Sequence, residues 1–503
     1  MSNFENTSLP SGWAETTLGC VVDPRLGKAK PQTMPNSKFI GMEQVEAHTM
    51  RLLGTIPAKD MKSAANIFQA GDVLYGRLRS YLNKVYQPDF SGLCSGEFIV
   101  LPESTAAVGK FIKYRLNAGD FVRFASRINT GDRPRVDFDQ IKNFGLILPP
   151  KPEQERIADT LDELLSSLEA GVAALERVRG RLKSYRAAAL KSAVEGAATA
   201  SWREERGVEE SGSDLLERIL VERRRLWEAK KLRVFEESGR EPPKNWKSRY
   251  VEPRAAITTG LPGLPKNWCW ATIEQLTTEL SNGFGKRSQV SGSPRVVLRL
   301  ADISGGEVSL ADPRKINCTD DDIEQYALAE NDILVLRVNG SADLVGRFVL
   351  VRGAEDEVLY CDHFIRARPV SKSLSPWLRA VADTDRFRRY IELKKVSSAG
   401  QNTINQAALM SFAIPLPPEE ERVAISEMLQ EQFSVIDHVG AGTEAKLNGA
   451  QALRQSILRD AFAGKLVSQN SQDEPALELL KRFRAEQESG SSKFGKSRKR
   501  KAR

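Results

Sequence analysis

The chain has 503 residues, with 41% hydrophobic residues, 28% charged residues and a formal net charge of +8. Because single domains usually hold roughly 100–200 residues, this length predicts several globular domains, and no run of about 18 apolar residues suggests a membrane-spanning helix. The positive charge permits binding to a polyanion but does not establish it.

The N-terminus and the cysteines both favour a cytoplasmic location. The opening stretch MSNFENTSLPSGW lacks the basic and then apolar build of a signal peptide. The five cysteines are scattered and form no C-x-x-C pair, which argues against a disulfide framework and a zinc module. They are Cys20, Cys94, Cys269, Cys318 and Cys361.

A mixed α+β globule is predicted over residues 1–150. Short apolar runs such as DVLYGRL and EFIVLP, broken by Gly, Pro, Asn and Asp, indicate strands. Two polar loops interrupt these runs. The loop at 75–84 carries Arg77, Arg79, Tyr81, Asn83 and Lys84, and the glycine-containing loop at 126–136 carries Arg127, Arg133 and Arg135.

Residues 151–200 are predicted as a long helical region. It begins after the proline cluster of LPPKPEQERIADTLDELL, with acidic residues suited to a helix N-terminus. From Leu161 to Ala189 the apolar positions are spaced 3.5 residues apart on average, the period of a coiled coil. The stripe comprises Leu161, Leu165, Leu168, Val172, Leu175, Val178, Leu182, Tyr185 and Ala189. A helix over 153–195 would be roughly 60 Å long.

The remaining segments repeat this plan. Residues 201–262 are a charged, partly helical bridge, with a helix predicted at 213–235. Residues 263–417 are a second α+β globule, with a helix over 376–395, and 418–470 are a second helical region. Its apolar stripe is interrupted at 440–450 and resumes at Leu453 and Ile457. Residues 471–503 are predicted as a helical end followed by a disordered basic tail.

An ordered internal repeat relates the two halves. LPSGW at 9–13 recurs as LPKNW at 264–268, a shift of 255, and GDVLYGRL at 71–78 recurs as NDILVLRV at 331–338, a shift of 260. The proline-acidic helix start recurs at a shift of 266. Because the order is kept while the shift drifts slowly, we interpret the halves as two copies with loop insertions.

The polar loops recur in the second globule. LRVNGSADLVGR at 336–347 and VSSAGQNTINQ at 396–406 stand where the basic loops stand in the first copy. Arg side chains pair with guanine edges and Asn or Gln with adenine edges, while further Arg and Lys contact phosphates. The candidate DNA-contacting residues are Arg77, Arg79, Tyr81, Asn83, Lys84, Arg127, Arg133, Arg135, Arg337, Asn339, Arg347, Gln401 and Asn402. The alternative for any one of them is an ordinary polar surface loop.

No catalytic constellation is evident. The sequence holds no phosphate-binding glycine motif and no N/D-P-P-[YF] tetrapeptide of an amino-methyltransferase. The histidines His48, His363 and His438 have no metal-ligand or triad spacing, so a structural role is expected for each. A recognition subunit is therefore expected rather than an enzyme, with no catalytic residues and no metal site.

Two similar globules, each followed by a long helix, predict a two-headed body. If the helices pair as an antiparallel coiled coil, the globules lie at its two ends in opposite orientation. On DNA such heads would meet two half-sites on opposite strands, separated by a spacer that the helices measure. The alternative is that each helix packs only on its own globule.

The chain resembles the specificity subunits of type I restriction–modification systems over nearly all of its length. LPSGW and LPKNW resemble the openings of that family's target recognition domains, and the two proline-acidic stretches resemble the entries to its helical regions. ILRDAFAGKLV resembles the end of the second region, whereas TGDRPRVDF departs from the more family-like AGQNTINQ of the second copy.

The resemblance implies a non-catalytic subunit that binds double-stranded DNA. It implies two methyltransferase subunits that methylate adenine using S-adenosylmethionine, and two motor-nuclease subunits that use ATP and Mg²⁺, with no cofactor bound by this chain. Two other hypotheses stay open at this point: a stand-alone regulator that binds a bipartite site, and a self-sufficient enzyme with an unrecognised site.

Overall fold

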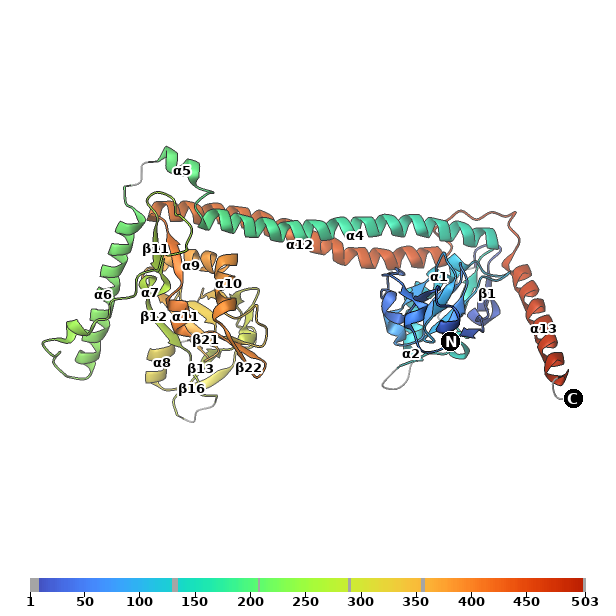
Figure 1. Cartoon of the computed structure of the whole chain (residues 1–503), viewed down its shortest axis with the longest axis horizontal. Helices are drawn as coiled ribbons and strands as arrows, with labels where there is room; N and C mark the ends of the chain where they lie inside the picture. The colour runs from blue at the N-terminus through green and yellow to red at the C-terminus, as the bar shows by residue number, and fades with distance from the viewer. Residues whose placement is uncertain (1–8, 129–133, 207–208, 288–290, 354–357, 501–503) are drawn as a thin grey trace. The chain divides into compact units, whose positions relative to one another are not determined.

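The structure of the chain is a computed structural model, which describes residues 9–128, 134–206, 209–287, 291–353 and 358–500, with side chains described as far as residue 488 (Figure 1). The chain divides into two compact units. The first comprises Met1–Arg177 and Thr443–Arg503, and the second comprises Val178–Gly442. Each unit contains one globule, which we call the first head (residues 9–150) and the second head (residues 263–417). Among the described residues, no helix has the length and apolar character needed to cross a bilayer.

The first head is built from small sheets with helices against them. A five-stranded sheet has the order β2-β5-β8-β3-β4, a three-stranded sheet has the order β7-β6-β9, and β1 pairs with β10. The strands are β1 (Ala14–Thr17), β2 (Lys28–Ala29), β3 (Lys38–Ile40), β4 (Ile56–Pro57), β5 (Ala65–Phe68), β6 (Val73–Gly76), β7 (Val85–Tyr86), β8 (Gly92–Cys94), β9 (Phe98–Leu101) and β10 (Gly145–Leu148). The helices are α1 (Gly109–Asn117), α2 (Gly119–Arg127) and α3 (Phe138–Ile141).

The second head has a similar architecture with more strands, although the largest of its sheets has four. Its sheets have the orders β12-β21-β17-β19, β16-β13-β20 and β18-β23-β22, with the pairs β14-β15 and β11-β24. The strands are β11 (Cys269–Thr272), β12 (Thr277–Asn282), β13 (Ser293–Leu298), β14 (Ile303–Ser304), β15 (Glu307–Val308), β16 (Lys315–Cys318), β17 (Ile333–Leu336), β18 (Val338–Asn339), β19 (Phe348–Leu350), β20 (Leu359–Tyr360), β21 (Phe364–Pro369), β22 (Val396–Ser398), β23 (Gln401–Thr403) and β24 (Ala413–Leu416). The helices are α7 (Ile273–Leu276), α8 (Asp320–Tyr326), α9 (Ser375–Ala382), α10 (Asp385–Lys394) and α11 (Gln406–Met410).

Within the described residues, five further α-helices lie outside the heads. The two long ones are α4 (Lys151–Val194) and α12 (Glu419–Phe462), and each begins directly after the Pro-Pro pair that follows a head's last strand. The others are α5 (Ala200–Glu205), α6 (Gly212–Glu237) and α13 (Ala476–Arg500). Ser211 caps α6, because its hydroxyl accepts from the backbone N–H of Asp214 while the Asp214 carboxylate accepts from the N–H of Ser211.

The repeat seen in the sequence is confirmed by matching contacts in the two units. In the first unit the indole of Trp13 donates to Glu153 at 3.0 Å, and in the second the indole of Trp268 donates to Glu421 at 2.8 Å. Each pair joins the start of a head to the first turn of the long helix that leaves it. The predicted similarity of LPSGW to LPKNW and of the two helix starts therefore marks one hydrogen bond made twice.

The entry and exit of each head also correspond. Strand β1 runs antiparallel to β10, with Ala14 opposite Leu148, and β11 runs antiparallel to β24, with Cys269 opposite Leu416. After each long helix, a later helix (α6 or α13) returns to the start of a head. The N–H of Gly212 at the start of α6 donates to the Asn267 carbonyl at 2.7 Å, and that of Ala476 at the start of α13 donates to the Gly12 carbonyl at 2.9 Å.

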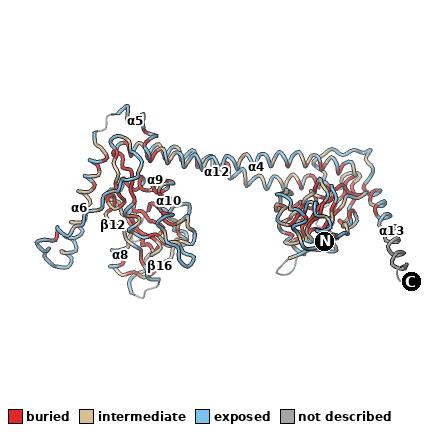
Figure 2. The backbone as a smooth tube through the Cα atoms, viewed as in Figure 1, coloured by how far each residue is buried: buried red, intermediate tan, exposed pale blue. Residues whose placement is uncertain are grey.

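Each head's core extends onto the ends of the long helices. In the first unit, buried Phe111 and Phe121 belong to a cluster that includes Leu161 of α4 and Leu458 of α12. In the second unit, Trp377 belongs to a cluster with side chains of α4, α6 and α12. Figure 2 shows the buried residues concentrated in the heads, while the long helices away from the heads are mostly intermediate or exposed. The helix ends are thus held by ordinary apolar burial.

Several expectations from the sequence need correction. The segment 376–395 forms two helices, α9 and α10, because Thr384 caps a new helix with its hydroxyl. The predicted interruption of the apolar stripe at 440–450 does not break helix α12, which runs through this segment as part of the predicted helical region. Tyr185 of the α4 stripe and Leu453 of the α12 stripe are 59% and 51% exposed. Helix α13 continues to Arg500, so the basic segment predicted as disordered is helical up to that residue.

Candidate nucleic-acid interface

The backbone around Arg77 joins the two predicted loops of the first head. The N–H of Arg77 donates to the Glu97 carbonyl at 2.8 Å, and the Arg77 carbonyl accepts from the N–H of Val136 at 3.0 Å. Its guanidinium forms an ion pair with Asp137. The sequence analysis predicted 75–84 and 126–136 as separate loops. In the structure the two loops are joined by hydrogen bonds at Arg77, the residue that follows β6.

Exposure separates the candidates of the 75–84 loop into two groups. Arg79 is exposed, and Tyr81 is 48% exposed. Asn83 is only 1% exposed, and Lys84 uses its ammonium to donate to the Met42 carbonyl at 2.6 Å. Asn83 adopts a φ of 42°, a left-handed conformation that asparagine tolerates better than most residues. The prediction that Asn83 faces DNA does not fit this burial.

The basic residues of the 126–136 loop lie beside the first group. The N–H of Arg79 donates to the Pro134 carbonyl at 2.8 Å, and Arg135 forms an ion pair with Glu97 at 2.6 Å. Arg127 is exposed at the end of α2. Arg133 lies outside the described residues. The first head therefore brings Arg77, Arg79 and Arg135 to one place, with two of their charges already paired to carboxylates.

The second head repeats the backbone arrangement around Arg337. The N–H of Arg337 donates to the His363 carbonyl at 2.8 Å, and the Arg337 carbonyl accepts from the N–H of Ile404 at 3.0 Å. These are the same two bonds that Arg77 makes, at the same lengths. The structure therefore matches Glu97 to His363 and Val136 to Ile404, in agreement with the sequence shifts.

A β-hairpin stands next to Arg337. Strands β22 and β23 pair with Ser398 opposite Gln401, and the turn residues Ala399 and Gly400 have φ angles of 48° and 76°. Two successive positive φ angles are typical of a tight type I′ hairpin turn. Gln401 is exposed, and its side chain makes no hydrogen bond within the described part of the chain. A two-stranded ribbon of this kind has dimensions that the DNA major groove admits.

Asn402 and Asn339 are held inside this loop cluster. The amide of Asn402 donates to the Gly340 carbonyl at 3.0 Å, and its Oδ1 accepts from the Ser397 hydroxyl at 2.5 Å. The Oδ1 of Asn339 accepts from the N–H of Ser341 at 2.8 Å. The amides of Asn402 and Asn339 thus fix the loops. Of the three candidate amide residues of this head, Gln401 is the one whose side chain is open to solvent. Arg347 is exposed, and its Nε donates to the Asp343 carbonyl at 3.1 Å.

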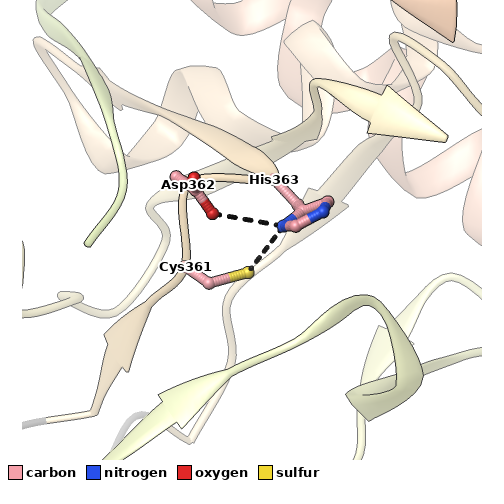
Figure 3. A group of neighbouring side chains, drawn as sticks. All are labelled: Cys361, Asp362 and His363. Carbon is pink, nitrogen blue, oxygen red and sulfur yellow. Dashed lines mark hydrogen bonds and ion pairs between the residues drawn. The ribbon is translucent and has the colours of Figure 1, made fainter. Parts of the chain in front are cut away.

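Sequence reasoning missed a group of side chains at 361–363. Figure 3 shows Cys361, Asp362 and His363 facing one another, with His363 Nδ1 at 3.2 Å from the Asp362 carboxylate and 3.7 Å from the Cys361 sulfur. Among the described residues, these three side chains form a group whose ligand atoms lie close enough together to hold a metal ion. Burial raises the pKa of the Cys361 thiol. Since these residues are consecutive, their proximity alone is a weak signal.

Sequence comparison identifies relatives of one kind. Residues 62–177 match the family described as the type I restriction modification DNA specificity domain. The chain is 28% identical to the StySPI type I restriction enzyme specificity subunit of Salmonella potsdam, over 79% of this chain and 74% of that protein. It is 24% identical to the EcoKI specificity subunit of Escherichia coli K12, over 81% of this chain and 77% of that protein.

The fold agrees with these relatives. The HsdS subunit of Thermoanaerobacter tengcongensis matches with a TM-score of 0.50 and 19% identity, covering 92% of this chain and 99% of the other. A chain from a structure of type I R-M complex assembly and conformational transition matches with a TM-score of 0.56 and 19% identity, covering 91% and 100%. The family match and these relatives support a DNA specificity subunit of the type I restriction–modification kind, a class of subunit that is itself non-catalytic.

Proposed function

We propose that the chain reads an asymmetric bipartite DNA target, one half-site with each head. The observation that carries this proposal is the duplicated setting of Arg77 and Arg337, which presents a polar loop cluster at the same point of both heads. The loops differ in sequence, so the two half-sites would differ as well. Non-identical heads give a target without internal symmetry.

We propose further that α4 and α12 pair as an antiparallel coiled coil. In the first unit Arg454 of α12 forms an ion pair with Glu169 of α4 at 3.3 Å, and in the second Arg186 of α4 forms one with Asp437 of α12 at 2.6 Å. From Glu169 to Arg186 the chain advances 17 residues, and from Arg454 to Asp437 it goes back 17. Moving 17 residues forward along α4 therefore corresponds to moving 17 residues backward along α12, as expected for two antiparallel helices in one register.

Apolar contacts support the same register. In the second unit the guanidinium of Arg186 lies 4.1 Å from the centre of the Phe433 ring, and Gly440 lies near the Leu182 side chain. Leu165 and Leu458 share the core cluster of the first unit. The helices would then set the gap between the half-sites, and their repeated faces would offer two equivalent docking positions.

Base recognition is assigned to the exposed residues of each loop cluster. In the second head, Gln401 at the hairpin tip would contact a base edge, and glutamine suits adenine, which presents an acceptor and a donor in the major groove. In the first head, Arg79 and Tyr81 occupy the exposed positions. Arg127, Arg135 and Arg347 would contact phosphates or the groove edge.

The chemistry belongs to partners. We propose two methyltransferase subunits, which bring S-adenosylmethionine and methylate one adenine on each strand, and two motor-nuclease subunits, which bring ATP and Mg²⁺. An adenine must leave the base stack to be methylated, so the partner's pocket receives it while this chain holds the flanking sequence.

Methylome sequencing of cells with and without the gene tests the proposal. Adenine methylation at one bipartite motif should disappear when the gene is deleted and return with the intact chain. An unchanged methylome in cells with an active methyltransferase partner would contradict it. Tight binding of the motif by the pure chain, with no partner co-purifying, would favour the stand-alone regulator instead.

The assignment of Gln401 has its own test. Replacing Gln401 with Ala should relax recognition at one base pair of one half-site, because a bidentate contact discriminates by about 1–3 kcal/mol. Gln430→Ala on the exposed side of α12 is the matched control and should leave both half-sites unchanged. If Q401A lowers methylation evenly at all positions, or alters the other half-site, Gln401 does not read a base.

A further inference from the structure

A cavity of about 260 Å³ opens in the second head beside the Cys361–His363 turn. It lies between the chain that follows β12, the β13–β16 pair and this turn. Its lining residues are Phe284, Gly285, Lys286, Arg287, Val297, Arg299, Leu300, Ala301, Arg314, Ile316, Cys361, Asp362 and His363. These come from segments up to 79 positions apart in the chain, from Phe284 to His363, so no sequence motif marks the cavity.

Positive charge dominates the lining. It holds the cations Lys286, Arg287, Arg299 and Arg314 against one carboxylate, that of Asp362. Arg299 forms an ion pair with Asp302 at 2.8 Å, and Lys286 lies 3.6 Å from Asp322. Even with these two outer carboxylates counted, the cations are in excess.

Two of the cations have no carboxylate partner within the described residues. Arg314, a lining residue, donates from its guanidinium to the main-chain carbonyl of Arg287, and the Arg287 side chain is exposed. A guanidinium so placed matches the geometry of a phosphate group. The cavity therefore offers fixed donors to an anion that arrives from solvent.

The floor of the cavity is apolar. Phe284, Val297, Leu300 and Ile316 provide it. At about 260 Å³ the cavity has more room than a single bound ion needs. A sugar ring has apolar C–H faces, so a sugar attached to the phosphate would cover this floor.

One wall of the cavity is hydrogen-bonded to the proposed reading loops. The guanidinium of Arg337 donates to the Asp362 carbonyl at 3.1 Å, and its N–H donates to the His363 carbonyl. The Arg337 carbonyl binds Ile404, one residue beyond β23 of the hairpin. The turn that forms one wall of the cavity is thus hydrogen-bonded to the residue that anchors the hairpin.

We infer that this cavity is a seat for a sugar–phosphate unit of the DNA backbone beside the half-site that the hairpin reads. The inference rests on the proposed function and adds the anchoring site of the second head. We call it the phosphate seat. Contacts to phosphates fix the register of a protein on DNA without reading sequence, so the seat would hold the hairpin in place over its bases.

The first head is built differently at the corresponding turn. Glu97 stands where the second head has His363, and its carboxylate pairs with Arg135. A carboxylate at this position repels a phosphate, whereas an imidazole does not. The seat is therefore expected to belong to the second head alone, which makes the two heads unequal in their dependence on salt.

A metal ion is a poorer occupant. The Cys361, Asp362 and His363 groups could face a cation, but the same cavity is lined by four cationic side chains. The Coulomb repulsion from these groups acts against a divalent cation and in favour of an anion. A structural zinc site would also need a fourth ligand, and the group has three members.

The test measures DNA binding by the full chain, together with the methyltransferase it co-purifies with, across a series of KCl concentrations. Arg287→Gln and Arg314→Gln remove cations from the seat, and Lys372→Gln is a charge-matched control in the 3₁₀ turn beside Arg422 of α12. Each phosphate contact contributes about 0.9 to the slope of log affinity against log salt. The slope should fall by about this amount in R287Q and R314Q and stay unchanged in K372Q. An unchanged slope in all three would overturn the inference.

Neutral backbone probes locate the contact. Methylphosphonate is placed at one phosphate at a time, and one position should weaken the wild-type complex while leaving the R287Q complex unaffected. Since Arg287 is exposed, R287Q should keep the wild-type unfolding temperature, which separates this loss from misfolding. Stabilisation by free AMP with an unaltered salt slope would overturn the DNA assignment, as would Zn²⁺ stabilising the wild type but not Cys361→Ser. A wild-type complex that bound no DNA would contradict the proposed function itself.

Discussion

The two tryptophan–glutamate contacts look alike, but replacing their glutamates should have very different effects. Glu421 is 0% exposed and accepts from the Trp268 indole at 2.8 Å, from the Thr199 hydroxyl at 2.6 Å and from the Arg203 guanidinium. Glu153 is 1% exposed and accepts from the Trp13 indole at 3.0 Å, while its Oε1 has no partner within the described residues. One carboxylate is paired and the other is nearly bare.

The structure sets the expected magnitudes for the Gln variants. Glu421→Gln removes the charge that pairs with Arg203 and turns an NH₂ group toward donors. Breaking a buried ion pair costs about 3–5 kcal/mol, and since Arg203 keeps 17% exposure we expect the lower end, about 3 kcal/mol. Glu153→Gln exchanges a poorly compensated buried charge for a neutral amide, so its effect should stay within about 1 kcal/mol of zero.

Calorimetry and urea unfolding of the full chain measure the difference. At about 2–4 °C per kcal/mol for a unit of this size, E421Q should lower the unfolding temperature of its unit by about 6–12 °C, and E153Q should move it by less than about 4 °C. Arg203→Met combined with E421Q should cost less than the sum of the single changes, because the partners couple directly. Equal losses from E421Q and E153Q would refute the assignment of the extra stability to Thr199 and Arg203.

Three other changes have defined outcomes. Burial raises the pKa of Glu153, so the folded chain binds this proton more tightly than the unfolded chain, and the stability of the wild type falls as the pH rises from about 4.5 through the folded pKa. Urea unfolding should therefore show that the stability of E153Q relative to wild type increases over that range, and a decrease would contradict this. Deleting residues 171–177 of α4 together with 446–452 of α12 shortens the proposed helix pair by about 10 Å, which is about three base pairs at roughly 3.4 Å each. Methylome sequencing should then show a shorter gap between unchanged half-sites. An unchanged gap would show that the helices do not set the spacing. Asn402→Ala removes the amide that ties the hairpin to the Gly340 carbonyl, and it should impair methylation that depends on the second half-site. Because Asn405 still caps α11, the variant should stay folded, and its thermal unfolding should be close to that of the wild type.

The repeat could be predicted because both copies kept the same residues in the same order. Trp13 and Trp268, with Glu153 and Glu421, stood in the repeated motifs, and the structure shows that each tryptophan binds its glutamate. The bond itself was not predictable, because its partners are 140 and 153 positions apart and no local pattern links them. Helix starts and most strands followed from local signals, whereas the lengths of the apolar stripes did not show how much of each helix is buried.

The candidate site was predicted only at the level of loops. Composition marked 75–84 as basic and polar, but burial of Asn83 and the use of the Lys84 ammonium by the Met42 carbonyl depend on the folded backbone. In the second head, Gln401 and Asn402 are neighbours with similar chemistry, and only the hairpin register decides which one faces solvent. The phosphate seat was missed entirely, because its cations come from separate segments that meet through β13 and β16.

The pairing of each head's first strand with its last has a consequence for how new specificities arise. Because β1 lies against β10 and β11 against β24, the chain enters and leaves each head through two adjacent strands beside the long helices. Genetic exchange with crossovers in the codons of β1 and β10 would replace the part of the first head between Thr17 and Gly145. Crossovers in the codons of β11 and β24 would replace the part of the second head between Thr272 and Ala413. Both exchanges would leave the long helices intact. Under the proposed function, one such exchange would replace the half-site that a head reads and leave unchanged the helices on which partner subunits would dock.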